Sequence, residues 1–333
     1  MKLDSPEAFR DAIRAGERRA VARAITLLES TRADQAELGQ AVLEQLVPYT
    51  GAATRVGITG PPGVGKSTFI EALGLQLIGR GHRVAVLAVD PSSPVSGGSI
   101  LGDKTRMERL AQRPEAFIRP SPSGGSLGGV AHRTREAMLV VEAAGHDVVL
   151  VETVGIGQSE VAVASMVDFF CVLLQPGAGD ALQGIKKGVL ELADALVVTK
   201  ADGDQAALAT RTRAEHAQAL GLLRPTSPHW RARVLEVSAL EGRGIDAVWA
   251  AVEEHRRVLT ESGELEGRRR EQSRAWLWSL LEEGLERAFL GNPEVARRLP
   301  ALERDVQERK LSPAAAARAL LDVFRSQAPR RAG

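Results

Sequence analysis

One short run of residues constrains this chain more than any other feature of its sequence. The run Gly60-Pro-Pro-Gly-Val-Gly-Lys-Ser67 matches the pattern G-x-x-x-x-G-K-[S/T] at every fixed position. It follows an apolar run, Val56 to Thr59, and precedes a predicted helix that reaches about Gly79. This strand, loop and helix order is the context that the pattern requires. The sequence therefore predicts a phosphate-binding loop that opens a helix.

The residue types in this loop suit the phosphates of a nucleotide. Glycines let successive backbone N–H groups turn inward, and the start of the following helix adds the positive end of its dipole. We expect Lys66 to reach the β- and γ-phosphate oxygens and the Ser67 hydroxyl to ligate Mg²⁺. The predicted phosphate-binding residues are Gly60, Pro61, Pro62, Gly63, Val64, Gly65, Lys66, Ser67 and Thr68.

Short apolar runs alternate with helical stretches through the middle of the chain. Continuous apolar strands separated by helices are typical of a parallel sheet that is covered on both faces. We therefore expect an α/β fold of the P-loop NTPase class, with a mostly parallel sheet flanked by helices. The predicted strands are Val56–Thr59, Val84–Val89, Val148–Val151, Phe169–Leu174, Ala195–Val198 and Val234–Val237.

Helical extensions are predicted on both sides of this region. Cap residues at Asp4–Glu7 and periodic apolar positions indicate helices before Pro48, and prolines open two helix candidates, Pro293–Lys310 and Pro313–Phe324. A further predicted helix carries an apolar stripe, which consists of Trp278, Leu281, Leu285, Ala288 and Phe289. This stripe must be buried against the core or against another chain, and the residues alone leave both open. The predicted parts are 1–53, 54–256 and 257–333.

Composition excludes several classes of protein. The 333 residues include 43 Lys and Arg against 42 Asp and Glu, so a formal net charge of +1 gives no reason to expect a nucleic-acid partner. No apolar run is long enough for a membrane helix. The single Cys171 cannot form an internal disulfide and is expected to be a small buried residue, and the histidines lack the spacing of metal ligands. We expect a cytoplasmic protein without a membrane partner.

Two segments at predicted strand ends resemble elements that read a guanine base. Thr199-Lys200-Ala201-Asp202 resembles the N-K-x-D element of GTPases, with Thr199 in the Asn position. The Asp202 carboxylate would accept hydrogen bonds from the guanine N1–H and 2-amino groups, which adenine cannot donate. Ser238-Ala239-Leu240 resembles the S-A element, whose backbone N–H reads guanine O6. These segments favour GTP over ATP.

Further carboxylates follow predicted strands and are candidates for Mg²⁺ and for the attacking water. Glu152-Thr-Val-Gly155 resembles the D-x-x-G switch with Glu for Asp. Its carboxylate would hold Mg²⁺ directly or through water, and the Gly155 N–H would sense the γ-phosphate and so order or release the loop through Gln158. Asp90 and Asp103 are further candidates. The predicted catalytic residues are Lys66, Asp90, Glu152 and Gln158, and the predicted metal ligands are Ser67, Asp90, Asp103 and Glu152.

Taken together, these segments resemble the MeaB / ArgK / methylmalonic aciduria type A family, a group of SIMIBI-class P-loop GTPases. The resemblance covers about residues 54–256, and the run Glu152-Thr-Val-Gly-Ile-Gly-Gln-Ser159 is the most specific part of it. Asp90-Pro-Ser-Ser-Pro94 and Gln175-Pro-Gly-Ala-Gly-Asp180 also carry it.

The resemblance implies a homodimeric GTPase that uses GTP, GDP and Mg²⁺. It implies a chaperone of adenosylcobalamin-dependent methylmalonyl-CoA mutase, which protects the mutase from inactivation and gates loading of its cofactor. It also implies that the C-terminal helices form the dimerisation arm and that 175–187 is a mobile switch. The carried-over residues are Lys66, Ser67, Asp90, Asp103 and Glu152 for phosphate and metal, and Thr199, Lys200, Asp202 and Ser238 to Leu240 for guanine.

Alternative functions remain at this point. One is a P-loop ATPase that positions cargo, and another is a kinase or ATPase that serves a transport system; a nickel metallochaperone is disfavoured because Cys171 is alone. Two features are assigned no chemistry: Arg268-Arg269-Arg270 is expected to be a solvated helix face, and Trp276 and Trp278 are expected to be packing anchors.

Overall fold

The computed structural model describes residues 3–89, 107–120, 127–153, 159–177, 187–221 and 225–326. The chain divides into two compact units, Met1–Gln272 and Ser273–Gly333. Each unit is described by itself below. The division of the chain into the three predicted parts stays a prediction.

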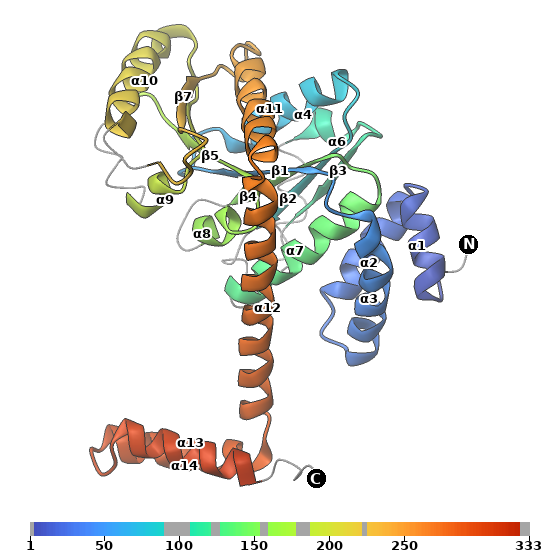
Figure 1. The fold of residues 1–333 in the computed structure, drawn as a ribbon, viewed down its shortest axis with the longest axis vertical. Helices are drawn as coiled ribbons and strands as arrows, with labels where there is room; N and C mark the ends of the chain where they lie inside the picture. The colour runs from blue at the N-terminus through green and yellow to red at the C-terminus, as the bar shows by residue number, and fades with distance from the viewer. Residues whose placement is uncertain are drawn as a thin grey trace. The chain divides into compact units, whose positions relative to one another are not determined.

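A parallel sheet forms the centre of the first unit (Figure 1). Among the described residues it has seven strands in the order β3-β2-β4-β1-β5-β6-β7, and all of their pairings are parallel. This confirms the predicted fold class. The strands are β1 (Thr54–Thr59), β2 (Val84–Val89), β3 (Ala116–Arg119), β4 (Val148–Thr153), β5 (Phe169–Leu174), β6 (Ala195–Val198) and β7 (Arg233–Glu236).

The strand β3 is absent from the prediction. It contains only four residues, Ala116–Arg119, and lies at the edge of the sheet beside β2. Pro114 and Pro120 flank it closely, and prolines so near a short apolar run conceal a strand because they are themselves typical of turns.

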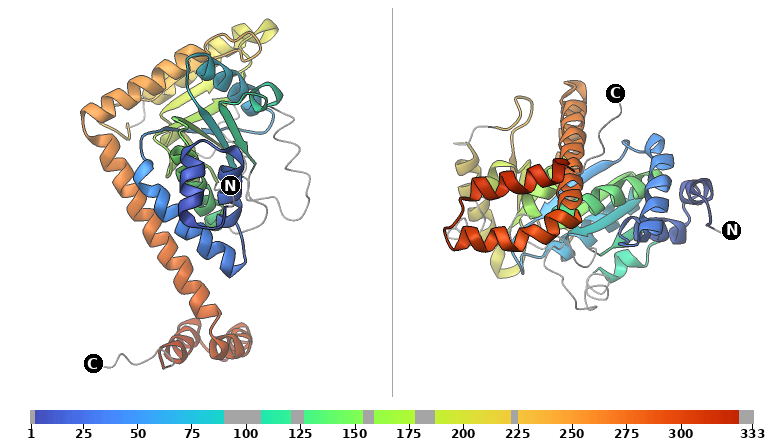
Figure 2. Two further views of the ribbon diagram at one scale, coloured as in Figure 1. Left: turned by 90° about the vertical axis from the view of Figure 1, so that its right-hand side faces the viewer. Right: turned by 90° about the horizontal axis from the view of Figure 1, so that it is seen from below.

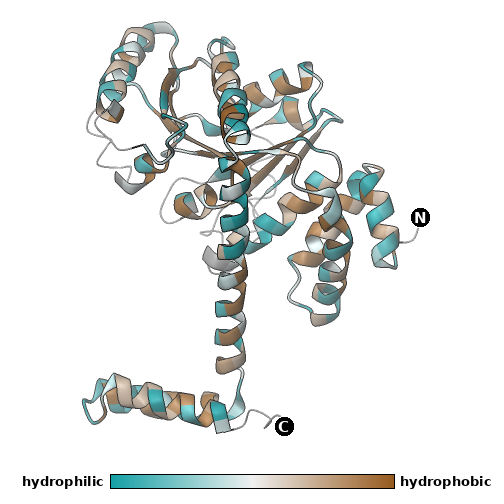
Figure 3. Cartoon of the chain, viewed as in Figure 1, coloured by the Kyte–Doolittle hydropathy of each residue, from teal (hydrophilic) through white to brown (hydrophobic). Residues whose placement is uncertain are grey.

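The strands are apolar on both sides because helices cover both faces of the sheet. Successive residues of a strand point to opposite faces, and in β4 Val149 and Val151 join one hydrophobic cluster while Val148 and Leu150 join the other. Figure 3 shows the strands coloured as hydrophobic along most of their length. This double burial accounts for their continuous apolar sequences.

Different helices cover the two faces. The first cluster takes residues from α7 (Leu127–Ala143), α8 (Ser159–Ala164), α9 (Lys187–Glu191) and α10 (Ala206–Gly221), and from the N-terminal helices. The second cluster takes residues from α4 (Lys66–Gly79), α6 (Glu108–Ala111) and α11 (Ile245–Glu261).

Helices α1 (Pro6–Arg14), α2 (Arg18–Leu28) and α3 (Ala33–Leu46) confirm the helical N-terminal segment, which ends in a 3-10 turn at Val47–Tyr49. The Ser5 hydroxyl accepts a hydrogen bond from the Ala8 N–H, and Pro6 begins the helix, as the cap pattern predicts. Figure 2 shows these helices grouped beside one another, and α2 and α3 contact α7. They therefore extend the core over one face of the sheet.

The start of α12 (Glu264–Leu290) is joined to the sheet by arginines, so the expected solvated face is wrong for two of the three. Arg269 donates to both carboxylate oxygens of Asp168, at 2.7 and 2.6 Å, and to the carbonyls of Gly51 and Ala53. Arg268 donates to the Asp168 carbonyl at 2.9 Å. Because Asp168 precedes β5 and Ala53 precedes β1, these bonds hold the amino ends of two central strands.

The second unit consists of helices. It contains the later turns of α12, α13 (Pro293–Gln307) and α14 (Pro313–Ser326), which confirms the two helices predicted to begin at prolines. Phe289 and Phe324 meet edge to face with ring centroids 5.5 Å apart. Trp278 is 57% exposed within this chain, and the packing role expected for it stays a prediction. Among the described residues, no helix has the length and apolarity to span a membrane.

Candidate nucleotide site

The predicted phosphate-binding loop connects the central strand β1 to α4. In the sheet, β1 lies between β4 and β5, where the chain order reverses, and such points form ligand crevices at the carboxyl ends of the strands. Helix α4 begins at Lys66 and ends at Gly79, as the sequence predicts. The motif therefore lies at the position in the fold where this sheet class binds its ligands.

Glycines are required in this loop by its backbone. Gly60, Gly63 and Gly65 have φ values of 154°, 75° and 98°, which other residues rarely adopt. A Cβ atom on Gly60 would lie 2.7 Å from the Leu173 carbonyl oxygen. The loop thus lies directly against the end of β5.

Lys66 brings a positive charge to the same loop. Its Nζ donates hydrogen bonds to the carbonyls of Gly60, at 2.7 Å, and Pro61, at 3.2 Å. Because Lys66 is also the first residue of α4, its ammonium group and the positive end of the helix dipole act together on any anion bound here. Ser67 follows in the first turn and is half-buried.

Thr199 faces the phosphate-binding loop. Its side chain is buried, and its hydroxyl lies 2.7 Å from the Val64 carbonyl and 3.1 Å from the Leu174 carbonyl. The sequence does not reveal this bond because its partners are far from Thr199 along the chain. The hydroxyl thus stabilises the phosphate-binding loop through the Val64 carbonyl. The contribution of Thr199 and Lys200 to base binding stays a prediction.

The two predicted base-reading segments lie next to each other. The Ser238 hydroxyl and the Asp202 carboxylate are 2.5 Å apart, and the Glu241 N–H donates to the same hydroxyl at 3.1 Å. Arg243 donates to the Ala201 carbonyl. This arrangement holds the Asp202 carboxylate in one orientation, as recognition of a planar base requires.

Leu240 of the same segment is 81% exposed. Ala239 lies between it and Ser238 and is half-buried. Neither side chain shows which base binds, so their roles in the guanine site stay a prediction.

Glu152 lies near the end of β4 and on the same side of the sheet as α4. Its alignment with Ile58 of β1, and the alternation of side chains along β4, place it on the face of Leu150, which packs in the cluster of α4. The side chain is only 9% exposed. The carboxylate therefore projects on the side of the sheet that carries Lys66 and Ser67.

A magnesium ion suits the oxygen donors at this place. Mg²⁺ is held by one or two protein oxygens together with phosphate oxygens and water, and Ser67 and Glu152 offer one hydroxyl and one carboxylate. Within the part of the chain that the structure describes, no cluster of three or more His, Cys, Asp or Glu residues forms a metal centre by itself. The donor set fits a nucleotide-associated Mg²⁺.

Four predicted site residues lie outside the described residues: Asp90, Asp103, Gly155 and Gln158. Their roles stay predictions. The structure shows one further contact near the site: the hydroxyls of Thr59 and Thr153 are 2.6 Å apart. Neither threonine was among the predicted site residues. A threonine as the last residue of the strand is the signal that points to each of them.

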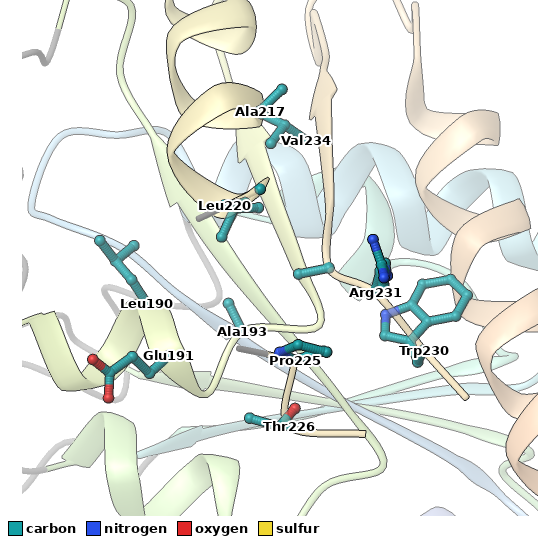
Figure 4. A pocket seen from close by; sticks show the side chains of 12 residues that line it. Leu190, Glu191, Ala193, Ala217, Leu220, Pro225, Thr226, Trp230, Arg231 and Val234 are labelled. Carbon is teal, nitrogen blue, oxygen red and sulfur yellow. The ribbon is translucent and has the colours of Figure 1, made fainter. Parts of the chain in front are cut away.

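A cavity of about 250 Å³ lies near the amino ends of β6 and β7 and is separate from this site. Figure 4 shows Leu190 of α9, Leu220 of α10 and Val234 of β7 among the side chains around it. Trp230 and Ala193 also line it and precede β7 and β6, so it opens near the amino ends of these strands. Parallel sheets bind nucleotides at the carboxyl ends.

Cys171 takes no part in the chemistry. It is 1% exposed within β5, and burial raises the pKa of its thiol. A protonated, buried thiol is a poor nucleophile and metal ligand, so the expected structural role is confirmed.

Comparison with known proteins agrees with this geometry. A family profile described as "Methylmalonyl Co-A mutase-associated GTPase MeaB" matches residues 21–294. The chain belongs to the MeaB family of GTPases. It is therefore a P-loop GTPase that hydrolyses GTP.

Relatives carry several different names. A "Probable GTPase" of Mycobacterium tuberculosis is 55% identical over 320 residues, which cover 96% of this chain and 95% of the relative. The "GTPase ArgK" of Escherichia coli is 49% identical over 315 residues and covers 95% of each chain. The mitochondrial "Methylmalonic aciduria type A homolog" of Mus musculus is 47% identical over 322 residues, which cover 94% of this chain and 78% of the relative.

A solved structure described as a "LAO/AO transport system kinase" shares the fold of this MeaB-family chain. It has a TM-score of 0.77 and 39% sequence identity, and the match covers 98% of this chain and 99% of that one. The names thus agree on the family and differ on the process that it serves.

Proposed function

We propose that this MeaB-family GTPase is a Mg²⁺-dependent chaperone of adenosylcobalamin-dependent methylmalonyl-CoA mutase, which protects the mutase and gates loading of its cofactor. The observation that carries the proposal is the family match over 21–294, whose description names a mutase-associated GTPase. The mouse relative, named for methylmalonic aciduria, adds support.

The proposed chemistry uses residues from several strand ends. Lys66 would neutralise charge on the β- and γ-phosphates, and the first turn of α4 would bind phosphate oxygens through its N–H groups. Ser67 and Glu152, with Asp90 and Asp103, would hold a Mg²⁺ that supplies further charge neutralisation. In hydrolysis, the water oxygen forms a bond to the γ-phosphorus, and the bond between the γ-phosphorus and the β–γ bridging oxygen breaks.

Recognition of GTP would depend on the second pair of segments. We assign Asp202 to the guanine N1–H and 2-amino groups, and the backbone of Ser238–Leu240 to O6. The 2.5 Å contact between Ser238 and Asp202 supports this assignment because it fixes the carboxylate before the base arrives. ATP would leave the carboxylate unpaired, which costs about 1–3 kcal/mol.

We also propose a homodimer formed through the C-terminal helices. In the second unit, α12 exposes an apolar stripe: Leu277, Trp278, Leu281 and Leu285 are 56%, 57%, 45% and 65% exposed. Contiguous exposed apolar surface of this kind marks an interaction site. Replacing Leu281 and Leu285 by Glu should convert the dimer to a monomer in analytical ultracentrifugation, and an unchanged dimer would exclude these helices.

The test of the chaperone proposal measures GTP hydrolysis with and without a purified adenosylcobalamin-dependent methylmalonyl-CoA mutase. We expect the mutase to accelerate hydrolysis and to bind the chain with different affinity in GTP and GDP, because a partner shifts only the states for which its affinities differ. Loss of mutase activity during turnover should also be slower with this chain present. Absence of all three effects would contradict the proposal.

A second candidate follows from the name of the solved relative, the "LAO/AO transport system kinase". It predicts transfer of the γ-phosphoryl group to a protein, whereas the chaperone proposal predicts inorganic phosphate. Incubation with γ-labelled nucleotide and a membrane extract separates the two outcomes. The cytoplasmic location stays a prediction from the sequence.

A further inference from the structure

We propose that Thr59 and Thr153 are positioning residues, and that the hydrogen bond between their hydroxyls sets the distance between Glu152 and the phosphate-binding loop. This inference rests on the proposed role of Glu152 at the magnesium ion. It adds to the site two residues that do not touch the nucleotide.

The contact is a buried hydrogen bond between two neighbouring strands. The two Oγ1 atoms are 2.6 Å apart, and Thr59 and Thr153 are 1% and 0% exposed. A buried hydroxyl is costly unless it is hydrogen-bonded. Valine has nearly the same shape and would fill both positions without that cost, so packing alone does not explain two threonines.

The hydroxyl bond lies just beyond the end of the main-chain ladder. The last aligned pair of β1 and β4 is Ile58 with Glu152. The next residue of each strand is paired with the strand on its other side: Thr59 with Val172 of β5, and Thr153 with Val89 of β2. The side chains of Thr59 and Thr153 therefore continue the contact between β1 and β4 where the ladder has stopped.

This point controls two parts of the proposed site. Thr59 directly precedes Gly60, where the phosphate-binding loop begins, and Thr153 directly follows Glu152. A separation of the two strand ends would move the Glu152 carboxylate away from Lys66 and Ser67. The hydroxyl bond holds the ends together.

The two threonines lie on the opposite face of the sheet from Glu152. Successive side chains alternate between faces of the sheet, so Thr153 lies on the face of Val151 and Glu152 lies on the face of Leu150. Val151 belongs to the cluster with α7 and α8, and Leu150 to the cluster with α4. The threonines therefore reach the metal and phosphates only through the main chain, which defines them as positioning residues.

The experiment compares Thr59→Val, Thr153→Val and the double variant. Each single change leaves one buried hydroxyl without its partner and should lower both the melting temperature and kcat. The double change removes both hydroxyls and should recover the melting temperature, since replacing both partners by apolar groups of the same shape is nearly neutral. We expect the kcat of the double variant to remain about 10- to 100-fold below that of wild type. Its KM for GTP should change less than twofold, and its half-saturating Mg²⁺ concentration should rise.

Two further variants serve as controls. Thr153→Ser keeps the hydroxyl and should retain most of the wild-type kcat. Thr134→Val removes another buried hydroxyl, which donates to the Val130 carbonyl within α7 at 2.9 Å, and should leave kcat and Mg²⁺ dependence unchanged. A double valine variant with wild-type kcat and Mg²⁺ dependence would overturn the inference.

Glu152→Gln separates this inference from the proposed function. If that variant keeps the wild-type dependence on Mg²⁺, the role of Glu152 is wrong and the positioning role falls with it. If Glu152→Gln raises the Mg²⁺ requirement while the double valine variant does not, only the positioning role is wrong.

Discussion

The Thr199 hydroxyl lies 2.7 Å from the Val64 carbonyl and so links the segment that carries Asp202 to the phosphate-binding loop. The bond is buried and joins residues that are far apart in the sequence. The segment predicted to read the base therefore also supports the backbone predicted to bind the phosphates.

Thr199→Val should weaken GTP and GDP binding by similar factors. The variant leaves the buried Val64 carbonyl with one hydrogen bond fewer, at a cost of about 1–3 kcal/mol, but does not alter the Asp202 carboxylate. Calorimetry with GTP, GDP and ATP measures the effect. The matched control is Thr210→Val, which removes an exposed hydroxyl in α10. A change in preference between GTP and ATP would show instead that Thr199 reads the base.

Asp202→Asn should weaken binding of GTP and favour xanthosine triphosphate, whose ring offers a carbonyl where guanine has its amino group. The Asn oxygen can still accept from Ser238, so the local fold should persist. Titration of both nucleotides into the variant tests the exchange of preference. Unchanged affinity for GTP would remove Asp202 from the base site.

Contiguous motifs made much of this structure predictable. The loop at Gly60–Ser67 fixes a strand before it and a helix after it, and the apolar runs fix six of the strands. Pairings between distant residues were not predictable: Arg269 looks like part of a solvated basic run, yet its partner Asp168 lies 101 residues away. The bond between Thr59 and Thr153 depends in the same way on strand order.

Asp168→Asn and Arg269→Met should each destabilise the fold by about 3–5 kcal/mol, because removing one partner leaves the other charge buried and unpaired. The Asp168 side chain is 1% exposed, and that of Arg269 is 18% exposed. Urea unfolding gives the free energy of each variant. The exposed pair Arg257 and Glu261 provides the control, because breaking such a pair costs less than about 1 kcal/mol. Similar losses at both pairs would contradict the assignment.

Acid should destabilise the protein through His146. Burial lowers the pKa of His146 from 6.5 to about 4, so the unfolded chain binds a proton that the folded chain excludes. This contribution to stability is complete above about pH 6.5 and is lost as the pH falls toward 4, reaching about 3 kcal/mol. Unfolding free energies measured from pH 7 to 4 should fall less steeply for His146→Phe than for wild type. Equal slopes would exclude His146 as the cause.

Lys66→Ala tests the nucleotide site most directly. We expect the variant to release phosphate from GTP at a rate near the uncatalysed background, because Lys66 supplies positive charge to the phosphates. Its circular dichroism spectrum should stay that of wild type, because the packing of α4 does not depend on this side chain. The measurement is release of inorganic phosphate by both proteins at saturating GTP and Mg²⁺. Near-wild-type turnover by a correctly folded variant would contradict the assignment of Gly60–Ser67 as the site of GTP hydrolysis.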